Sequence, residues 1–173
     1  MISASPCLIA GVNIQRLTAH LDTRGCFTEI FRESWLPSAR FVQWNAVHSR
    51  AGTLRGVHVH RKHADYLVLL AGRMWLGLAD LRHHPRSDIA RTVIEITGSQ
   101  PVSVAIPPLV AHGFLFAEDS VHVYAVSEYF NPADELGCRW NDSALGLEWP
   151  MTPTQLSARD QDLPSLGVLL ATL

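Results

Sequence analysis

Short apolar runs separated by turn residues dominate the chain from residue 12 to residue 129. The runs are rich in valine, leucine and aromatic side chains, which favour an extended backbone. The pattern therefore predicts a series of short strands. They are Val12–Leu17, Cys26–Phe31, Phe41–Ser49, Thr53–His58, Tyr66–Ala71, Met74–Leu81, Thr92–Ile96, Val102–Ile106, Gly113–Ala117 and Val121–Tyr129.

The segments between these runs predict turns and a little helix. The sequence Ala-Gly-Arg at Ala71–Arg73 predicts a tight hairpin turn, and His84–Asp88 and Thr97–Pro101 predict loops. Glu33–Ala39 predicts one or two helical turns, limited by its proline, and Pro164–Leu173 predicts a terminal helix. Many short strands with little helix indicate an all-β sandwich or barrel.

Composition narrows the class of protein. The chain has 173 residues, of which 47% are hydrophobic, and shows no linker or internal repeat, so we expect one domain with a sizeable core. Its formal net charge is only −2 and no basic block occurs, which argues against a nucleic-acid partner. No apolar run reaches the roughly 18 residues that a membrane span needs, so we expect no membrane segment.

The number and spacing of the cysteines indicate the cellular compartment. Cys7, Cys26 and Cys138 are odd in number and widely spaced, with no Cys-x-x-Cys pair and no zinc-ribbon spacing. This usage fits a reducing cytoplasm. The first residues also lack a charged segment followed by an apolar one, so we expect no signal peptide.

Polar residues gather in a few separated motifs. These are Asp22–Gly25 (Asp-Thr-Arg-Gly), Leu54–His58 (Leu-Arg-Gly-Val-His) and Ile106–Phe114, with Tyr124 and Asp160 further along. Together they supply a histidine base with a carboxylate to hold it, a tyrosine acid, and cationic groups for an anionic substrate. Such a set is suited to moving protons at a carbon beside a carbonyl group.

In order and spacing, these motifs resemble the dTDP-4-dehydrorhamnose 3,5-epimerases, a family of jelly-roll cupins. The resemblance continues through Phe41–Asn45, Ala79–Arg82, Arg139–Asp142, Gly146–Pro150 and Leu156–Asp160. It implies an all-β fold, a cupin jelly-roll barrel or sandwich with short peripheral helices, in a single domain over residues 1–173.

The resemblance also implies an activity and a catalytic set. The family inverts carbons C3 and C5 beside the 4-keto group of a nucleotide-linked 6-deoxy sugar, without a cofactor. His58 is then the base, Asp160 holds its imidazole, and Tyr124 returns a proton from the opposite face. An imidazole with an ordinary pKa of about 6.5 suits a base near neutral pH.

By the same resemblance, a further group of polar residues binds the substrate. It consists of Arg24, Glu29, Gln43, Asn45, Arg55, His112, Glu135 and Arg159. Arginine suits phosphate because its guanidinium presents a two-pronged donor. The family is a homodimer with exchanged N-terminal strands, so some of these contacts are expected to cross between subunits.

Structural alternatives stay open for several of these residues. Asp160 could be a helix or turn cap, and Tyr124 could be an ordinary strand residue with a satisfied hydroxyl. Arg24, Glu29 and Arg55 could form a structural ion-pair network.

One departure from the family falls in the catalytic region. The family's lysine, seven residues before the glycine that matches Gly72, is Asp65 here, and its glutamine two residues after the base is His60. The loop between them is shorter. The lysine is expected to help neutralise the enolate, so its replacement bears on the double epimerisation.

The same replacements create a second candidate chemistry. His58, His60, Asp65 and His112 follow the spacing of metal-binding cupins, with Asp in place of Glu. A His-x-His pair on a strand directs both side chains to one face. Such a set could bind one divalent Fe, Mn, Ni, Cu or Zn ion. Our main expectation is no metal, with this site as the alternative.

Three functions therefore remain in order of preference. They are a metal-free nucleotide-sugar epimerase, a metal-dependent cupin enzyme acting on another small molecule, and a non-catalytic sugar-nucleotide-binding cupin. Six further histidines have no family role, and most are expected to be exposed: His20, His48, His63, His83, His84 and His122. Among them, His63 lies in the shortened loop and is a candidate for the rim of the pocket. Trp44, between Gln43 and Asn45, could stack on the ligand or fill the pocket.

Overall fold

The computed structural model describes residues 9–82 and 89–173. Two five-stranded antiparallel sheets and one hairpin account for the strands of these segments. The loop predicted at His84–Asp88, His83 and Cys7 lie outside the described residues. The all-β fold predicted for the chain is confirmed.

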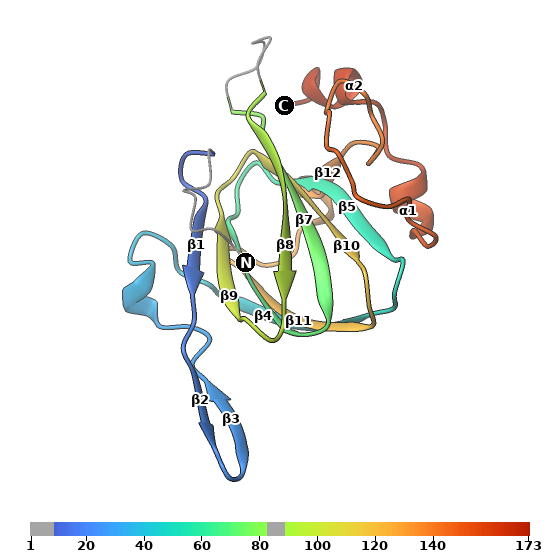
Figure 1. Cartoon of the computed structure of the whole chain (residues 1–173). Coiled ribbons are helices and arrows are strands. Elements are labelled where there is room, and N and C mark those ends of the chain that lie inside the picture. The colour runs from blue at the N-terminus through green and yellow to red at the C-terminus, as the bar shows by residue number, and fades with distance from the viewer. Residues whose placement is uncertain (1–8, 83–88) are drawn as a thin grey trace.

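The two sheets are interleaved in sequence. The first has the order β1 (Asn13–Arg16), β9 (Val102–Ile106), β6 (Asp65–Ala71), β11 (Ser120–Val126) and β4 (Gln43–Ser49). The second has the order β12 (Leu136–Gly137), β5 (Leu54–Val59), β10 (Val110–Phe116), β7 (Arg73–Asp80) and β8 (Arg91–Thr97). Figure 1 shows that the strands of the two sheets make up the central part of the molecule. Chain crossing between two antiparallel sheets is the jelly-roll arrangement.

The turn at Gly72 joins the two sheets. Strands β6 and β7 flank it closely but belong to different sheets, so the hairpin predicted at Ala71–Arg73 is wrong. The backbone of Gly72 has a φ of +86°, a conformation that residues with a Cβ rarely adopt. The local signal for a sharp turn was right, but it carries no information on which strands pair.

Strand β6 shows how period-two alternation builds two layers of core. Leu67 and Leu69 face the main core between the sheets, together with side chains of β7, β9 and β10. Tyr66 and Val68 face the other way, beneath the apolar side chains of residues 30–41. The second sheet is covered on its outer face by the C-terminal segment, whose Leu166 and Leu169 are buried there. Apolar side chains therefore cover both faces of strand β6.

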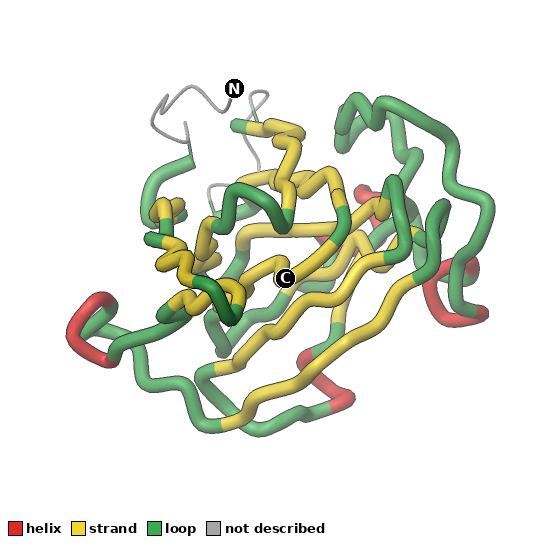
Figure 2. The backbone as a smooth tube through the Cα atoms, turned by 60° about the horizontal axis from the view of Figure 1, so that its bottom comes forward, coloured by secondary structure: helices red, strands yellow, loops and turns green. Residues whose placement is uncertain are grey.

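Helical structure is short and peripheral, as Figure 2 shows in red. It comprises η1 (Glu33–Trp35), η2 (Pro132–Asp134), α1 (Ala158–Gln161) and α2 (Leu166–Leu170). The helical turn predicted within 33–39 and the terminal helix within 164–173 are confirmed, each shorter than predicted. Ser157 and Ser165 cap α1 and α2 by accepting hydrogen bonds from backbone N–H groups. None of the helices in the described ranges is long and apolar enough to cross a membrane.

A two-stranded hairpin leaves the body of the molecule. Its strands β2 (Ala19–Asp22) and β3 (Gly25–Thr28) project below the sheets in Figure 1. Leu21 and Phe27 on this hairpin are 80% and 68% exposed. Strand β2 was missed from the sequence because it is only four residues long and all four are exposed, although Ala-His-Leu-Asp alternates apolar and polar residues.

A buried leucine and an exposed one provide a test of the core. We expect Leu78→Ala to lower the free energy of unfolding by about 2–5 kcal/mol, because Leu78 is fully buried between the sheets. Leu70→Ala is the matched control, since Leu70 is 45% exposed on β6 and should change stability by only about 0.5 kcal/mol. Urea denaturation followed by tryptophan fluorescence measures both. Equal losses would contradict the assigned core.

Candidate active site

A cavity of about 530 Å³ opens within the sandwich. Its walls come from both sheets and from the C-terminal segment. Strand β11 contributes alternate residues to it, His122, Tyr124 and Val126, as the strand period requires. Of the residues expected to act on or bind substrate, it is lined by His58, Tyr124, Asp160, Gln43, Arg55, His112, Glu135 and Arg159.

His58 and Asp160 form the closest acid–base pair of this cavity. The Nε2 atom of His58 lies 2.7 Å from Oδ1 of Asp160, and both side chains are largely buried. The second carboxylate oxygen of Asp160 accepts from the backbone N–H of Gly56 at 3.4 Å. Asp160 therefore holds the imidazole of His58. The alternative role of helix cap falls to Ser157, whose hydroxyl oxygen accepts a hydrogen bond from the backbone N–H of Asp160 at the start of α1.

The charge state of Asp160 follows from these contacts. Burial by itself would raise the pKa of its carboxyl group. The hydrogen bond and charge of His58, with hydrogen bonds from Gly56 and Ser157, outweigh burial and hold that pKa below its ordinary value. Asp160 is thus ionised at neutral pH and accepts the Nε2 proton. The lone pair of a neutral His58 is then on Nδ1.

A bulge in β5 brings Arg55 and His58 to the same cavity. Across the β5–β10 ladder, Arg55 pairs with Phe114 and His58 with His112, so two residues of β5 stand opposite Gly113 alone. Without this extra residue, the odd spacing would direct Arg55 and His58 to opposite faces.

Gly56 permits this bulge. Its φ is +109°, and a Cβ there would lie 2.8 Å from the carbonyl oxygen of His112. A larger residue would therefore be strained and crowded at the point where the bulge begins.

Tyr124 faces the cavity from the sheet opposite His58. Burial raises the pKa of its hydroxyl, the charges of Asp65 and Glu135 raise it further, and Arg55 opposes them. Tyr124 therefore carries its proton at neutral pH and is available as a donor. Its cross-strand neighbour Asn45 accepts a hydrogen bond from Gln43 Nε2 at 3.1 Å.

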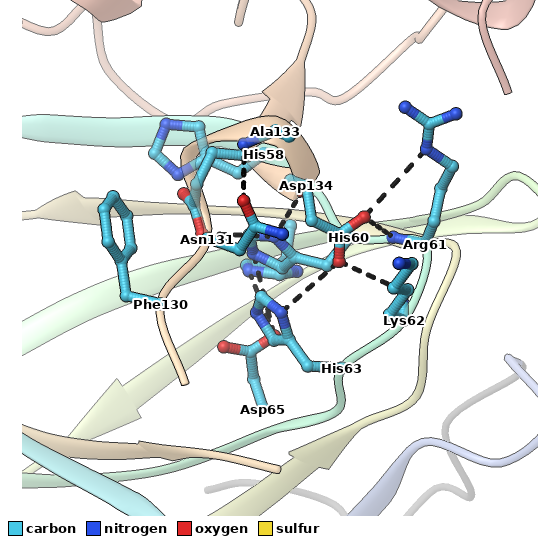
Figure 3. Close-up of polar contacts among 12 residues, drawn as sticks. His58, His60, Arg61, Lys62, His63, Asp65, Phe130, Asn131, Ala133 and Asp134 are labelled. Atoms are coloured by element: carbon cyan, nitrogen blue, oxygen red, sulfur yellow. Dashed lines mark hydrogen bonds and ion pairs between the residues drawn. The ribbon is translucent and has the colours of Figure 1, made fainter. Parts of the chain in front are cut away.

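A cluster of imidazoles surrounds one carboxylate at the other end of the site. The Nε2 atoms of His60, His63 and His112 each lie 3.8 Å from Oδ2 of Asp65. All four side chains are buried. Figure 3 shows His63 between Asp65 and Asp134, with His60 beside it. The rings of His60 and His63 stack with their centroids 3.8 Å apart.

Burial dominates the protonation of this cluster. It lowers the pKa of His60 and of His112 to about 4, and it raises the pKa of Asp65 to about 6. The two imidazoles are consequently neutral at physiological pH. His58 is not part of this cluster: in the described part of the chain, the groupings with metal-ligand geometry contain His60, Asp65 and His112, or His60, His63 and Asp134.

Arg24 and Glu29 lie away from the cavity of their own chain. Arg24 is on the projecting hairpin, where its Nη2 is 2.6 Å from Oδ2 of Asp22. Glu29 follows the hairpin and pairs with Arg32 at 2.6 Å. These ion pairs are local and exposed. Arg24, Glu29 and Arg55 do not form a common network.

Two buried polar residues, His122 and Asp134, escaped the sequence analysis, whereas His63, a candidate for the pocket rim, lines the cavity. His63 and His122 are buried, contrary to the expectation that most such histidines are exposed, whereas His20 and His48 are exposed as expected. Asp134 accepts from the backbone N–H groups of Arg61 and Lys62.

His122 could have been found from the period-two spacing with Tyr124, which directs both into the cavity. The loop at His63 and the 3₁₀ turn at Asp134 carry no such periodicity. Trp44, on the opposite face of β4 from Gln43 and Asn45, packs on Phe31 rather than lining the cavity.

The fold and the cavity define a jelly-roll cupin with a buried histidine–carboxylate pair facing a tyrosine, the equipment of an acid–base enzyme. A family model described as dTDP-4-dehydrorhamnose 3,5-epimerase matches residues 6–167. The chain belongs to this family, whose members are isomerases.

Individual relatives agree with the family. The chain is 31% identical to a dTDP-4-dehydrorhamnose 3,5-epimerase of Neisseria gonorrhoeae over 80% of its length, and the match spans 45% of that protein. A dTDP-6-deoxy-D-glucose-3,5-epimerase of Legionella pneumophila, solved with dTDP-4-keto-L-rhamnose, superposes with a TM-score of 0.86 at 26% identity, covering 95% of this chain and 93% of that one. A 3'-monoepimerase of Streptomyces bikiniensis, solved with dTDP-quinovose, gives a TM-score of 0.82 at 28% identity, covering 91% and 84%.

Proposed function

We propose that this protein epimerises a dTDP-linked 4-keto-6-deoxy sugar at C3, at C5 or at both. The observation that carries the proposal is the His58–Asp160 pair, which shares a cavity with Tyr124 on the opposite sheet. The family supports the nucleotide sugar as substrate, and its members include both a double and a single epimerase.

The chemistry follows from the acidity of carbons beside a ketone. His58 removes the proton from one face of C3 or C5, and the bonding electrons move to the 4-keto oxygen to give an enolate. Asp160 stabilises the imidazolium that forms. Tyr124 then donates its proton to the same carbon from the opposite face, and the carbonyl is restored. The imidazolium of His58 releases its proton to solvent, and solvent reprotonates the phenolate. Placement of base and acid on opposite sheets is what inversion requires.

Positive side chains of the cavity suit the diphosphate. Arg55 lines it, with its Nε donating to the hydroxyl oxygen of Ser49 at 3.0 Å, which leaves its terminal nitrogens for an anion. Arg159 also lines it and is held by the carboxylate of Glu135 at 3.3 Å. Gln43 orients its amide by accepting from the backbone N–H of Phe130. These contacts fix the binding groups before substrate arrives.

The projecting hairpin supports a homodimer. A monomer rarely exposes large apolar side chains together with a bare strand edge, and Leu21 and Phe27 lie on such a hairpin. We propose that the hairpin packs against a second copy of the chain. Arg24, at its tip, then belongs to the binding set of the partner's cavity.

Proton exchange provides the direct test of function. In D2O, we expect dTDP-4-keto-6-deoxyglucose to lose its C3 or C5 proton signal in the presence of the protein, because each enolisation exchanges that proton with solvent. Proton NMR shows which carbon reacts. Asp160→Asn should slow exchange by roughly 100- to 10,000-fold, whereas Asp162→Asn, an exposed residue that follows the same short helix, should not. No exchange at either carbon, with or without added metal, would overturn the proposed function.

Tyr124→Phe separates the two halves of the reaction. This variant keeps the base but lacks the acid on the other face, so we expect continued exchange with deuterium while formation of the inverted sugar falls by roughly 100-fold or more. The two products are distinguished by the ring proton couplings in the same NMR spectra. Loss of exchange together with inversion would show that Tyr124 is needed before the enolate forms.

The dimer has its own test. We expect the wild-type protein to sediment at about twice the chain mass of 19.2 kDa, and the Leu21→Ser/Phe27→Ser variant at the mass of one chain. Val168→Ser is the control, because Val168 is similarly exposed but lies on α2. Analytical ultracentrifugation gives the masses. A dimer that survives the double substitution would exclude the hairpin as its interface.

A further inference from the structure

We propose that the cavity binds one divalent first-row transition metal ion through Nε2 of His60, Oδ2 of Asp65 and Nε2 of His112, with Nε2 of His63 as the fourth ligand. This set differs from the one expected from sequence spacing, because His63 takes the place of His58. His58 stays with Asp160. The structure therefore separates a metal site from the acid–base pair.

The ligand atoms of His60, Asp65 and His112 lie within 4.8 Å of one another, and His63 approaches this group at Asp65. Each of the three Nε2 atoms is 3.8 Å from the same carboxylate oxygen, too far for a hydrogen bond. Around a tetrahedral ion with ligand bonds of about 2.0–2.1 Å, neighbouring ligand atoms are roughly 3.3–3.4 Å apart. The ligand atoms of His60, Asp65 and His112 must therefore draw together around the ion, and Nε2 of His63, which lies outside their group, must move further to become the fourth ligand.

The other ring nitrogens fix which atoms face the ion. Nδ1 of His112 lies 3.1 Å from the carbonyl oxygen of Val110, and Nδ1 of His60 lies 3.2 Å from that of Asp134. Carbonyl oxygens only accept, so both Nδ1 atoms carry the proton and both Nε2 atoms present lone pairs. Nδ1 of His63 faces the carboxylate of Asp134 at 3.5 Å. Histidines that bind metals are oriented by oxygen acceptors in this way.

The buried carboxylate of Asp65 also favours a bound cation. Asp65 is buried, and within the described ranges its ion-pair contacts are the three imidazoles rather than a lysine or arginine. A buried carboxylate facing three lone pairs is costly unless a positive charge lies between them. A bound cation supplies that charge.

The ligand chemistry selects the class of ion. Three imidazoles and one carboxylate suit zinc, iron, nickel or copper, whereas magnesium and calcium prefer sites made of oxygen ligands. All four ligands line the cavity that contains His58 and Tyr124. If the proposed function holds, the ion lies where an enolate oxygen needs positive charge and where the family has its lysine.

Cobalt provides a test without substrate. The protein is treated with a chelator, dialysed and titrated with Co²⁺ while visible absorption is recorded. We expect one Co²⁺ per chain, with ligand-field bands of a four- or five-coordinate ion that disappear when Zn²⁺ is added. Metal content after gel filtration gives the stoichiometry. Binding well below one ion per chain, or only the weak bands of hexa-aqua cobalt, would overturn the proposal.

Variants locate the ion. Asp65→Asn and His60→Gln should weaken Co²⁺ binding by more than 100-fold, and Asp134→Asn, which only orients His63, by roughly 10- to 100-fold. His122→Gln is the control, because His122 is a buried histidine of the same cavity outside the cluster. Circular dichroism melts confirm that each variant is folded. Wild-type affinity in Asp65→Asn would exclude this site. Because no sugar is used, failure here is distinct from failure of the exchange experiment.

Discussion

The contact between His58 and Asp160 joins the chemistry of the cavity to the closure of the fold. His58 belongs to a strand of the sandwich, whereas Asp160 arrives more than a hundred residues later on a short helix. The carboxylate also accepts the N–H of Gly56, so it contacts the bulge that turns His58 inward. The C-terminal segment therefore covers the outer face of the second sheet and completes the His58–Asp160 pair at the same time.

Period-two alternation explains why so many polar groups can enter an apolar sandwich. Strands β6 and β10 devote most of their inward positions to leucine, valine and phenylalanine, which belong to the core. Inward positions of β10 and β11 also carry His112, His122 and Tyr124, which line the cavity. Their imidazoles are buried and neutral, which the low pKa values of His112 and His122 reflect.

The sequence specified the strands and most of the cavity because both depend on local alternation and on motifs. Gln43, Arg55 and Tyr124, which were expected on that basis to act on or bind substrate, line the cavity. Pairing was harder, since the turn at Gly72 gives the same local signal whether it closes a hairpin or joins two sheets. The sequence suggested His63 only as a candidate for the pocket rim. Its orientation could not be predicted, because this loop side chain faces a residue distant in sequence, Asp134.

Asp65 imposes a condition on the proposed enolate mechanism in this cavity. An enolate is an anion, and an ionised Asp65 in the same low-polarity cavity repels it. The family's lysine would have attracted that anion, so replacing it with aspartate reverses the sign of the local charge. The carboxylate must then be neutralised by a proton or by a cation. Burial already raises its pKa to about 6, and three imidazole nitrogens face it. A metal ion would remove the repulsion at a pH where the proton is largely lost, and it would leave His58 free to act as the base.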